Sequence, residues 1–258
     1  MKKIITSALI AIISLASCKK DDTICYNNLT MGNIVDGNIV SDQGNTFDIT
    51  GAPLDLSQET FKYGRVILLC DVLKKTAENR YDIRLTGIES VLAKEPLPTS
   101  VVTPDSEAAV NDPIFVRDIW YGGGYINMLI EFARKSGSQK KHLINLIHED
   151  AATTEDGLKT YTFSLHHNAF EETPDNETVL DFEMYGGYVS FPVAGLIQED
   201  EAKITINWST HQVTNGNISW IETKEISKTY DWTRSGFEQA ASKTARPSLK
   251  LQKSHWIR

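Results

Sequence analysis

Four histidines in the second half of the sequence are the residues best suited to metal chemistry: His142, His148, His166 and His167. With Glu149 and Asp150 they could supply a zinc site, because imidazole nitrogens and carboxylate oxygens are common zinc ligands. However, no two of the histidines are two residues apart, the spacing that puts both side chains on one strand face. Adjacent His166 and His167 point to opposite faces. We predict no metal site, with His167 packed at a sheet edge and bonded to backbone, and the other histidines solvated.

Adjacent acids could support acid and base chemistry, but they lie in polar, loop-like stretches: Glu171 with Glu172, and Glu199, Asp200 with Glu201. Catalysis needs opposed acids carried by separate elements. The sequence has no Gly-x-Ser-x-Gly turn and no thiol placed for Cys-His chemistry. The run from Gly122 to Gly124 precedes a strand, so it lacks the helix N-terminus of a phosphate loop and indicates a turn. We predict no catalytic residues, no cofactor and no enzyme activity.

Five aromatic residues could in principle stack on sugar rings: Trp120, Tyr121, Tyr125, Trp208 and Trp220. Aromatic side chains contribute most of the buried area in protein cores. We therefore predict that these five fill the core of a β domain rather than a ligand surface.

A lipid-attachment motif stands near the N-terminus: Leu15, Ala16, Ser17 and Cys18. Lys2 and Lys3 precede an apolar run over residues 4–15, which is the order of charges and apolar residues in an export signal. The run is shorter than the roughly 20 residues that cross a bilayer. The motif resembles a bacterial lipobox, which implies cleavage before Cys18 and acylation of its thiol. Acyl chains such as palmitate stabilise membrane attachment by about 0.8 kcal/mol per buried methylene.

Residues 18–30 are polar and are predicted to form a tether between the lipid and the first domain. Lys20, Asp21 and Asp22 resemble the surface-export signal that follows the lipid cysteine in lipoproteins of Bacteroides-like bacteria. Thr23 lies in a triplet that resembles the O-glycosylation acceptor of the same organisms. A solvated linker would carry such short patterns as well. We predict a lipoprotein of the outer membrane, exposed on the cell surface.

Composition indicates a folded, exported body of two domains. The 258 residues are 41% hydrophobic, enough for sizeable cores, and their net charge is -8, or -10 once residues 1–17 with Lys2 and Lys3 are removed. Such an acidic chain repels nucleic acid, which we exclude as a partner. Cys25 and Cys70 could pair in an oxidising compartment, but we favour a buried Cys70 in a strand and an unpaired Cys25.

Residues 31–104 are predicted to form a small, OB-like barrel. Two strand-like segments, 32–40 and 44–50, flank a polar turn and indicate a hairpin. Segment 65–73 is almost continuously apolar, as expected of a strand covered on both faces. Segment 80–85 alternates between apolar and polar residues, so it has one wet face.

Residues 105–232 are predicted to form a β-sandwich, and no stretch of the chain has convincing helix periodicity. Regularly spaced strands divided by Gly, Asn and Asp turns favour this architecture. The strand over 126–132 is expected to pair with segment 140–147, and further strands are expected near 161–165 and 189–208. Residues 233–258 form a basic tail that we predict to be flexible, with one acidic residue and six basic ones: Arg234, Lys243, Arg246, Lys250, Lys253 and Arg258.

Several segments together resemble the NigD-like lipoproteins of Bacteroidota, from the lipobox to about Trp232: residues 63–67, 113–120, 123–127, 144–146 and 165–168. The resemblance implies an N-terminal OB-type domain, a C-terminal β-sandwich and no catalytic activity. It also implies an association with bacteriocin genes. The chain departs from the Leu-Arg-His-Asn motif that is usual in this family, because His166 occupies the position of the Arg.

Four functions remain open at this point. A non-enzymatic, membrane-anchored binding or accessory protein with an unknown protein or glycan partner is our first hypothesis. A bacteriocin-associated role in production or immunity rests on the resemblance alone, and a surface glycan-binding role is a further alternative. A metal-dependent hydrolase built on the histidines is the alternative from the enzyme class.

Overall fold

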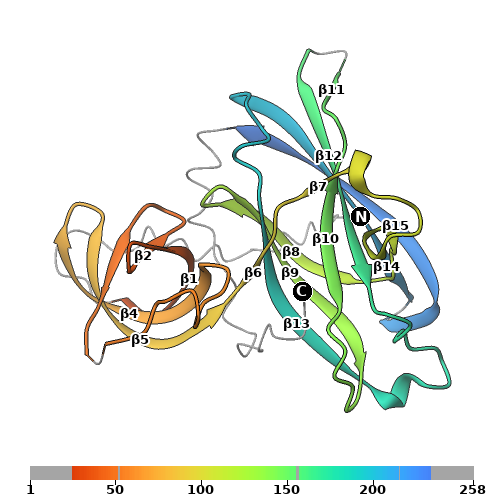
Figure 1. Ribbon diagram of the computed structural model, residues 1–258, viewed down its shortest axis with the longest axis horizontal. Coiled ribbons are helices and arrows are strands. Elements are labelled where there is room, and N and C mark those ends of the chain that lie inside the picture. Colours follow the sequence, from red (N-terminus) through yellow and green to blue (C-terminus); the bar gives the residue numbers. More distant parts are fainter. Residues whose placement is uncertain (1–24, 52, 155–156, 215, 234–258) are drawn as a thin grey trace, which may run out of the picture.

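The computed structural model describes residues 25–51, 53–154, 157–214 and 216–233. Several predictions fall outside these residues: the lipobox of Leu15, Ala16, Ser17 and Cys18, the export signal of Lys20, Asp21 and Asp22, the acceptor Thr23, and the basic tail from Arg234 onward. Within the described part, the chain is an all-β protein with a closed barrel followed by a sandwich, as the sequence predicted (Figure 1). This part contains no helix whose length and apolarity would allow it to cross a membrane.

Five strands close the barrel in the order β1-β2-β3-β5-β4. Their bounds are β1 Cys25–Val35, β2 Asn38–Ser41, β3 Thr46–Ile49, β4 Arg65–Ala77 and β5 Arg80–Ser90. β3 pairs with β5 in parallel and the other neighbours are antiparallel. Apolar side chains of β2, β3, β4 and β5 fill the interior, among them Ile39, Phe47, Leu68 and Ile83 at 5% exposure or less. The near-continuous apolar run in β4 is explained by its position, because its outer face packs against the sandwich.

One predicted barrel strand is in fact two. Segment 32–40 turns at Asp36 and Gly37, which join β1 to β2 with φ of 49° and 76°. Two consecutive positive φ angles are those of a two-residue hairpin turn, for which Asp-Gly is a favoured pair. The predicted hairpin between residues 32–40 and 44–50 is present as the β2–β3 pair.

The sandwich consists of a six-stranded sheet facing a four-stranded sheet. The larger sheet has the order β15-β14-β12-β10-β7, with β11 paired to β12; its strands are β7 Leu97–Pro98, β10 Leu143–His148, β11 Ala152–Thr153, β12 Lys159–Asn168, β14 Glu201–Thr214 and β15 Asn217–Thr233. The smaller has the order β6-β13-β9-β8, with β6 Leu92–Ala93, β8 Phe115–Gly122, β9 Tyr125–Lys135 and β13 Phe182–Pro192. Three short 3-10 helices, η2 Thr99–Val101, η3 Glu107–Ala109 and η4 Val179–Asp181, complete the described elements.

Alternating side chains from both sheets form one core between them. Ile126, Met128, Ile130 and Phe132 of β9 are at most 2% exposed, and they pack with the inward residues of β12 and β14. This period of two is the pattern of a sheet with one buried face. Burying one such side chain stabilises the fold by about 1.5–3 kcal/mol.

The predicted partner of strand 126–132 is wrong. β9 pairs with β13 and β8, whereas β10 lies in the other sheet and pairs with β12 and β7. The connection after β9 therefore crosses from one sheet to the other. Since β10 is apolar on both faces, its sequence was equally compatible with either sheet.

The barrel domain was predicted over residues 31–104, and the strands differ from this range at both of its ends. β1 begins at Cys25, inside the predicted tether of residues 18–30. β6 and β7 precede the predicted boundary at residue 104 but pair with β13 and β10 of the sandwich. Lys94, between these two strands, donates to the Ile144 carbonyl at 3.1 Å and to Asn145 Oδ1 at 2.5 Å, which binds the connecting segment to the sandwich.

The barrel packs against the smaller sheet of the sandwich through a joint apolar cluster. Met31 and Ile67 of the barrel and Tyr188 of the sandwich are at most 8% exposed, and Val91 lies between the two domains. Trp120 meets Tyr188 edge to face, with 6.2 Å between ring centroids. An apolar interface of this kind holds two domains in one arrangement.

A fully buried arginine stands beside this cluster and joins the two domains. Arg65 of β4 is 0% exposed. Its guanidinium forms a bidentate ion pair with Asp42 of the barrel, at 2.5 and 2.7 Å. It also donates to Asn127 Oδ1 at 2.9 Å and to Ser190 Oγ at 3.2 Å in the sandwich, and lies 4.2 Å from the Tyr125 ring centroid. We call these five residues the Arg65 clasp.

Gly123 allows the clasp to close. It lies in the β8–β9 turn with φ of 60°, and a Cβ at this position would collide with Asp42. Gly123→Ala is expected to lower the free energy of unfolding by about 2 kcal/mol, since a left-handed alanine costs about 1–2 kcal/mol and the carboxylate must also move. Urea denaturation checks this, with Gly137→Ala as the control because Gly137 has φ of 77° and open space around it. An equal loss in both variants would contradict the role of Asp42.

Candidate binding site

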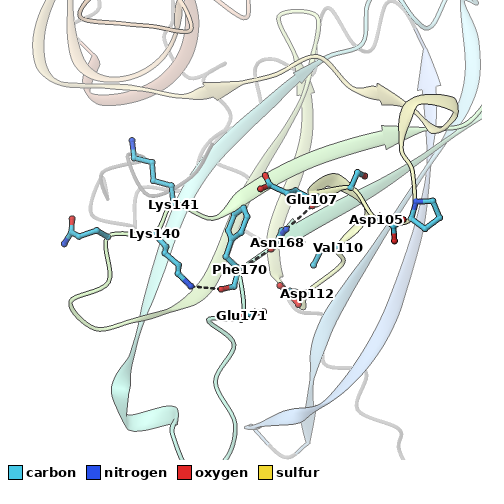
Figure 2. A pocket seen from close by; sticks show the side chains of 12 residues that line it. Asp105, Glu107, Val110, Asp112, Lys140, Lys141, Asn168, Phe170 and Glu171 are labelled. Carbon is cyan, nitrogen blue, oxygen red and sulfur yellow. Dashed lines mark hydrogen bonds between the residues drawn. The ribbon is translucent and has the colours of Figure 1, made fainter.

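Three connecting segments at one end of the sandwich surround an open pocket of about 930 Å³. They are the segment between β7 and β8, the segment between β9 and β10, and the segment after β12. Figure 2 shows the Phe170 ring between Lys140 and Lys141 on one side and Glu107 on the other. The volume is within the range of about 300–1,000 Å³ typical of small-molecule sites.

Hydrogen bonds between the segments hold the walls of the pocket in place. Lys140 Nζ donates to the Phe170 carbonyl at 2.9 Å, and Asn168 Nδ2 donates to the Glu107 carbonyl at 3.1 Å (Figure 2). The Ala169 amide donates to Asp112 Oδ2 at 2.8 Å. All three segments are therefore tied to one another, and the pocket is preformed rather than bounded by independent loops.

The wall after β12 has a strained backbone. Phe170 and Glu171 have φ of 53° and 66°, in the left-handed region that non-glycine residues rarely adopt. The Phe170 amide is held by Asn168 Oδ1 at 2.8 Å. Strain of about 1–3 kcal/mol per residue persists only where the surroundings impose it, and it is often found at functional sites.

Charged groups of both signs line the pocket without neutralising each other. Asp105, Lys141 and Glu171 form no hydrogen bond or ion pair with any other described residue. Lys140 forms an ion pair with Glu172, which does not line the pocket, with 3.9 Å between Nζ and Oε1. The free carboxylates and the free ammonium are thus available to a ligand.

A pair of buried histidines lies next to the residues that form these walls. His142 and His167 are 0% and 2% exposed, and His142 Nδ1 is 2.9 Å from His167 Nε2. Because His167 Nδ1 donates to the Pro113 carbonyl at 3.3 Å, its Nε2 must accept a hydrogen bond from His142 Nδ1. Both rings are then neutral, and His142 Nε2 is buried without a partner among the described residues. Phe132 packs on them, with its ring centroid 4.7 Å from that of His142.

Burial disfavours the charged form of both rings. It lowers the pKa of His142 to about 3, helped by the nearby charges of His167 and Arg134. Burial also lowers the pKa of His167 to about 4, although the Asp112 carboxylate opposes the shift. The predicted backbone bond of His167 is confirmed. The prediction that His142 is solvated is wrong, because it stacks on His167 inside the sandwich.

The remaining histidines do not join this pair. His148 is half-buried at the end of β10, and His166 points to the other face of β12, where its Nδ1 bonds the Ala108 carbonyl at 3.1 Å. The opposite orientation of His166 and His167 is confirmed. Among the residues that the structure describes, no three His, Cys, Asp or Glu side chains are close enough together to hold a metal ion.

The acids that the sequence suggested do not converge on one site. Glu171 is exposed at the pocket, whereas Glu172 accepts a hydrogen bond from Ser138 at 2.6 Å. Glu199 bonds the Tyr161 hydroxyl and pairs with Lys159 at 2.5 Å, and these two contacts lower its pKa to about 2. A carboxylate that is ion-paired with a lysine and has such a low pKa does not exchange protons readily at neutral pH.

The five candidate aromatic residues are buried or half-buried, as expected of packing residues. Trp208 is 4% exposed in the sandwich core, and Tyr121 packs edge to face on Trp232 at 5.7 Å. Tyr125 covers Arg65, and Trp220 meets His211 at 4.8 Å. The aromatic ring at the pocket is instead Phe170, which we did not predict.

Cys70 is a buried, free thiol in β4, as we favoured. Burial raises its pKa to about 11, so it is unreactive at neutral pH. The backbone of Cys25 is in register with Val72, two residues beyond Cys70.

The family of NigD-like C-terminal beta sandwich domains matches residues 98–222. The sandwich of this chain is therefore similar to the NigD-like family. No curated protein matches the sequence. The match covers the strands from β8 to β14 and includes the pocket, so the predicted resemblance to NigD-like proteins is confirmed.

Solved structures from Parabacteroides and Bacteroides species share this fold. A candidate toxin-related protein from Parabacteroides distasonis superposes with a TM-score of 0.56 at 17% identity, covering 86% of this chain and 100% of its own. A candidate lipoprotein from Bacteroides fragilis gives 0.54 at 14%, covering 81% and 97%. A NigD-like immunity protein from Bacteroides caccae gives 0.51 at 16%, covering 83% and 98%. The three superpositions cover 81–86% of this chain, which is more than the sandwich alone. The shared fold therefore includes the barrel.

The segments that carry the NigD-like resemblance meet in space at buried polar contacts. Segment 63–67 supplies Arg65, and segment 123–127 supplies Tyr125 and Asn127, all of which belong to the Arg65 clasp. Segment 144–146 supplies the acceptors of Lys94. Segment 165–168 contains His167 and the Asn168 that supports the pocket. These motif residues determine how the parts of the molecule join.

Proposed function

We propose that this protein is a non-enzymatic binding module, anchored to the outer membrane by lipid on Cys18, that binds its partner in the pocket of the sandwich. The observation that carries the proposal is the preformed pocket, whose charged groups Asp105, Lys141 and Glu171 are not used in contacts within the described structure. A solvent-accessible charged group in a preformed pocket is suited to recognising a ligand.

The buried histidines support a binding role over a hydrolytic one. His142 and His167 are enclosed in the sandwich and bond each other, so they do not offer nitrogens to a metal ion or a substrate in the pocket. Two of the acids that line the pocket, Asp105 and Glu171, are exposed and lack a buried partner, among the described residues, that would tune them for proton transfer. Turnover of a bound ligand that one point mutation abolishes would contradict the proposal.

The domain arrangement supports display of the pocket away from the membrane. The anchor enters at β1, and β9 runs from Tyr125 in the Arg65 clasp to Lys135 near the pocket. An 11-residue strand spans about 35 Å, so roughly that distance separates the clasp end of β9 from the end near the pocket. Because the barrel and sandwich are joined by the clasp, the chain presents the pocket in one orientation.

Lipid attachment is tested by Cys18→Ala in cells supplied with an alkyne-tagged fatty acid. The variant is expected to lose all label and to leave the membrane fraction, because acyl chains supply the anchoring energy. Cys70→Ala is the matched control: its thiol is buried, so labelling should be retained. A Cys18→Ala protein that remains labelled would disprove the anchor.

A bacteriocin-associated role is the second candidate. It is favoured by the similarity to a NigD-like immunity protein from Bacteroides caccae and to a candidate toxin-related protein from Parabacteroides distasonis. Deleting the gene should then raise the sensitivity of the cells to bacteriocin. Unchanged sensitivity across the strain's known bacteriocins would count against this role and leave the binding module as proposed.

A further inference from the structure

The pocket has the chemistry of a hydroxyl-rich ligand, and we infer that it binds a short, uncharged oligosaccharide. The inference rests on the proposed binding function and specifies the ligand. It depends on three features of the described residues: the signs of the charges, the single aromatic ring, and the fixed walls.

Charged residues of both signs line the pocket, which disfavours a ligand that is only anionic or only cationic. Lys140 and Lys141 lie on the segment after β9, whereas the acids lie on the other two segments: Asp105, Glu107, Asp112 and Glu171. An anionic ligand would meet the carboxylates, and a cationic one would meet the ammonium. A hydroxyl group both donates and accepts, so it can bond a carboxylate or an ammonium. A neutral polyol therefore suits a lining that contains groups of both signs.

The aromatic ring supplies the apolar part of such a site. Phe170 is half-buried, and Pro104 and Val110 also line the pocket. The C–H face of a pyranose ring packs on an aromatic face, while its hydroxyls point to the polar groups around it. Figure 2 shows Phe170 placed between the walls rather than outside them. One ring with polar groups around it matches a sugar better than an extended apolar ligand.

The fixed walls favour recognition of a weakly binding ligand. The Phe170 carbonyl is bound by Lys140, its amide by Asn168, and the amide of the preceding residue, Ala169, by Asp112. Since these bonds exist without a ligand, binding does not have to order the segments, which removes an entropic cost that a neutral sugar could not offset. The two residues with strained φ angles, Phe170 and Glu171, both line the pocket, as expected where strain is found at functional sites.

The test is calorimetric titration of the full-length protein, purified in a detergent without sugar groups, with maltohexaose, mannohexaose, xylohexaose and galactohexaose. At least one should bind saturably, and Phe170→Ala and Glu171→Gln should each weaken it about tenfold or more. Glu78→Gln, at an exposed acid in the β4–β5 turn of the barrel, should not change the affinity. Thermal melting of each variant confirms that it is folded.

Other outcomes overturn the inference. No binding of any of the four sugars, or binding that survives both pocket substitutions, would reject it. Tight binding of hexalysine or of oligogalacturonate at the same residues would replace the neutral sugar with a charged partner. Chromatography of the bound sugar after incubation separates this inference from the proposed function: cleavage would disprove the non-enzymatic role but leave the ligand class correct.

Discussion

Replacing Arg65 with methionine is expected to lower the free energy of unfolding by about 3–5 kcal/mol. The substitution leaves the Asp42 carboxylate, 3% exposed, without its cationic partner, and a buried unpaired charge is strongly destabilising. Asn127 and Ser190 of the sandwich also lose their bonds to the barrel. Urea denaturation followed by tryptophan fluorescence measures the change.

Arg80→Met is the control, because Arg80 forms a bidentate pair with Asp48 at 2.6 Å that is largely exposed. Exposed pairs contribute about 0–1 kcal/mol, so the two arginines should differ severalfold in effect. Adding Asp42→Asn to Arg65→Met should recover part of the loss by removing the unpaired charge. Equal effects of Arg65→Met and Arg80→Met would show that the clasp does not stabilise the molecule.

Acidification is expected to destabilise the protein on the order of 5 kcal/mol between pH 6.5 and 4. The pKa values of His142 and His167, about 3 and about 4, are below the ordinary value of 6.5. Between these limits the unfolded chain binds protons that the folded chain does not. The stability from these two residues is therefore complete above pH 6.5 and is lost as the pH falls toward 4. Thermal melting at constant ionic strength across this range measures it.

His142→Asn separates this effect from general acid denaturation. The introduced amide would still donate to His167 Nε2 but would carry no titratable ring. The slope of stability against pH should fall by about half between pH 6.5 and 4. An unchanged slope would mean that other groups cause the pH dependence.

The Arg65 clasp fixes the position of the barrel relative to the pocket of the sandwich. The clasp places the barrel on the sandwich, and β9 connects the clasp to the segment that carries Lys141. A ligand bound in the pocket would therefore be held at a set distance from the barrel and its N-terminal anchor. Loss of the clasp is expected to affect presentation of the ligand more than its affinity for the pocket.

The strand content and the two architectures follow from the sequence, because alternation and turn residues act locally. The period of two in residues 161–165 predicts a half-buried strand, and β12 contains it. Local patterns also explain the separation of His166 from His167. The lipobox is local in the same way, since four adjacent residues define it, and it remains a prediction outside the described residues.

Sheet assignment and the sites could not be predicted in this way. β10 is apolar on both faces, so its pattern fits either sheet, and only its pairing with β12 and β7 decides between them. Arg65 and Asn127 are 62 residues apart, and nothing in either segment shows that they meet. The pocket is formed by three loops whose side chains have no periodicity, so Asp105, Lys141 and Phe170 become neighbours only when the sandwich closes. Local patterning thus determined the secondary structure, while contacts between residues far apart in sequence decided where the chain can bind.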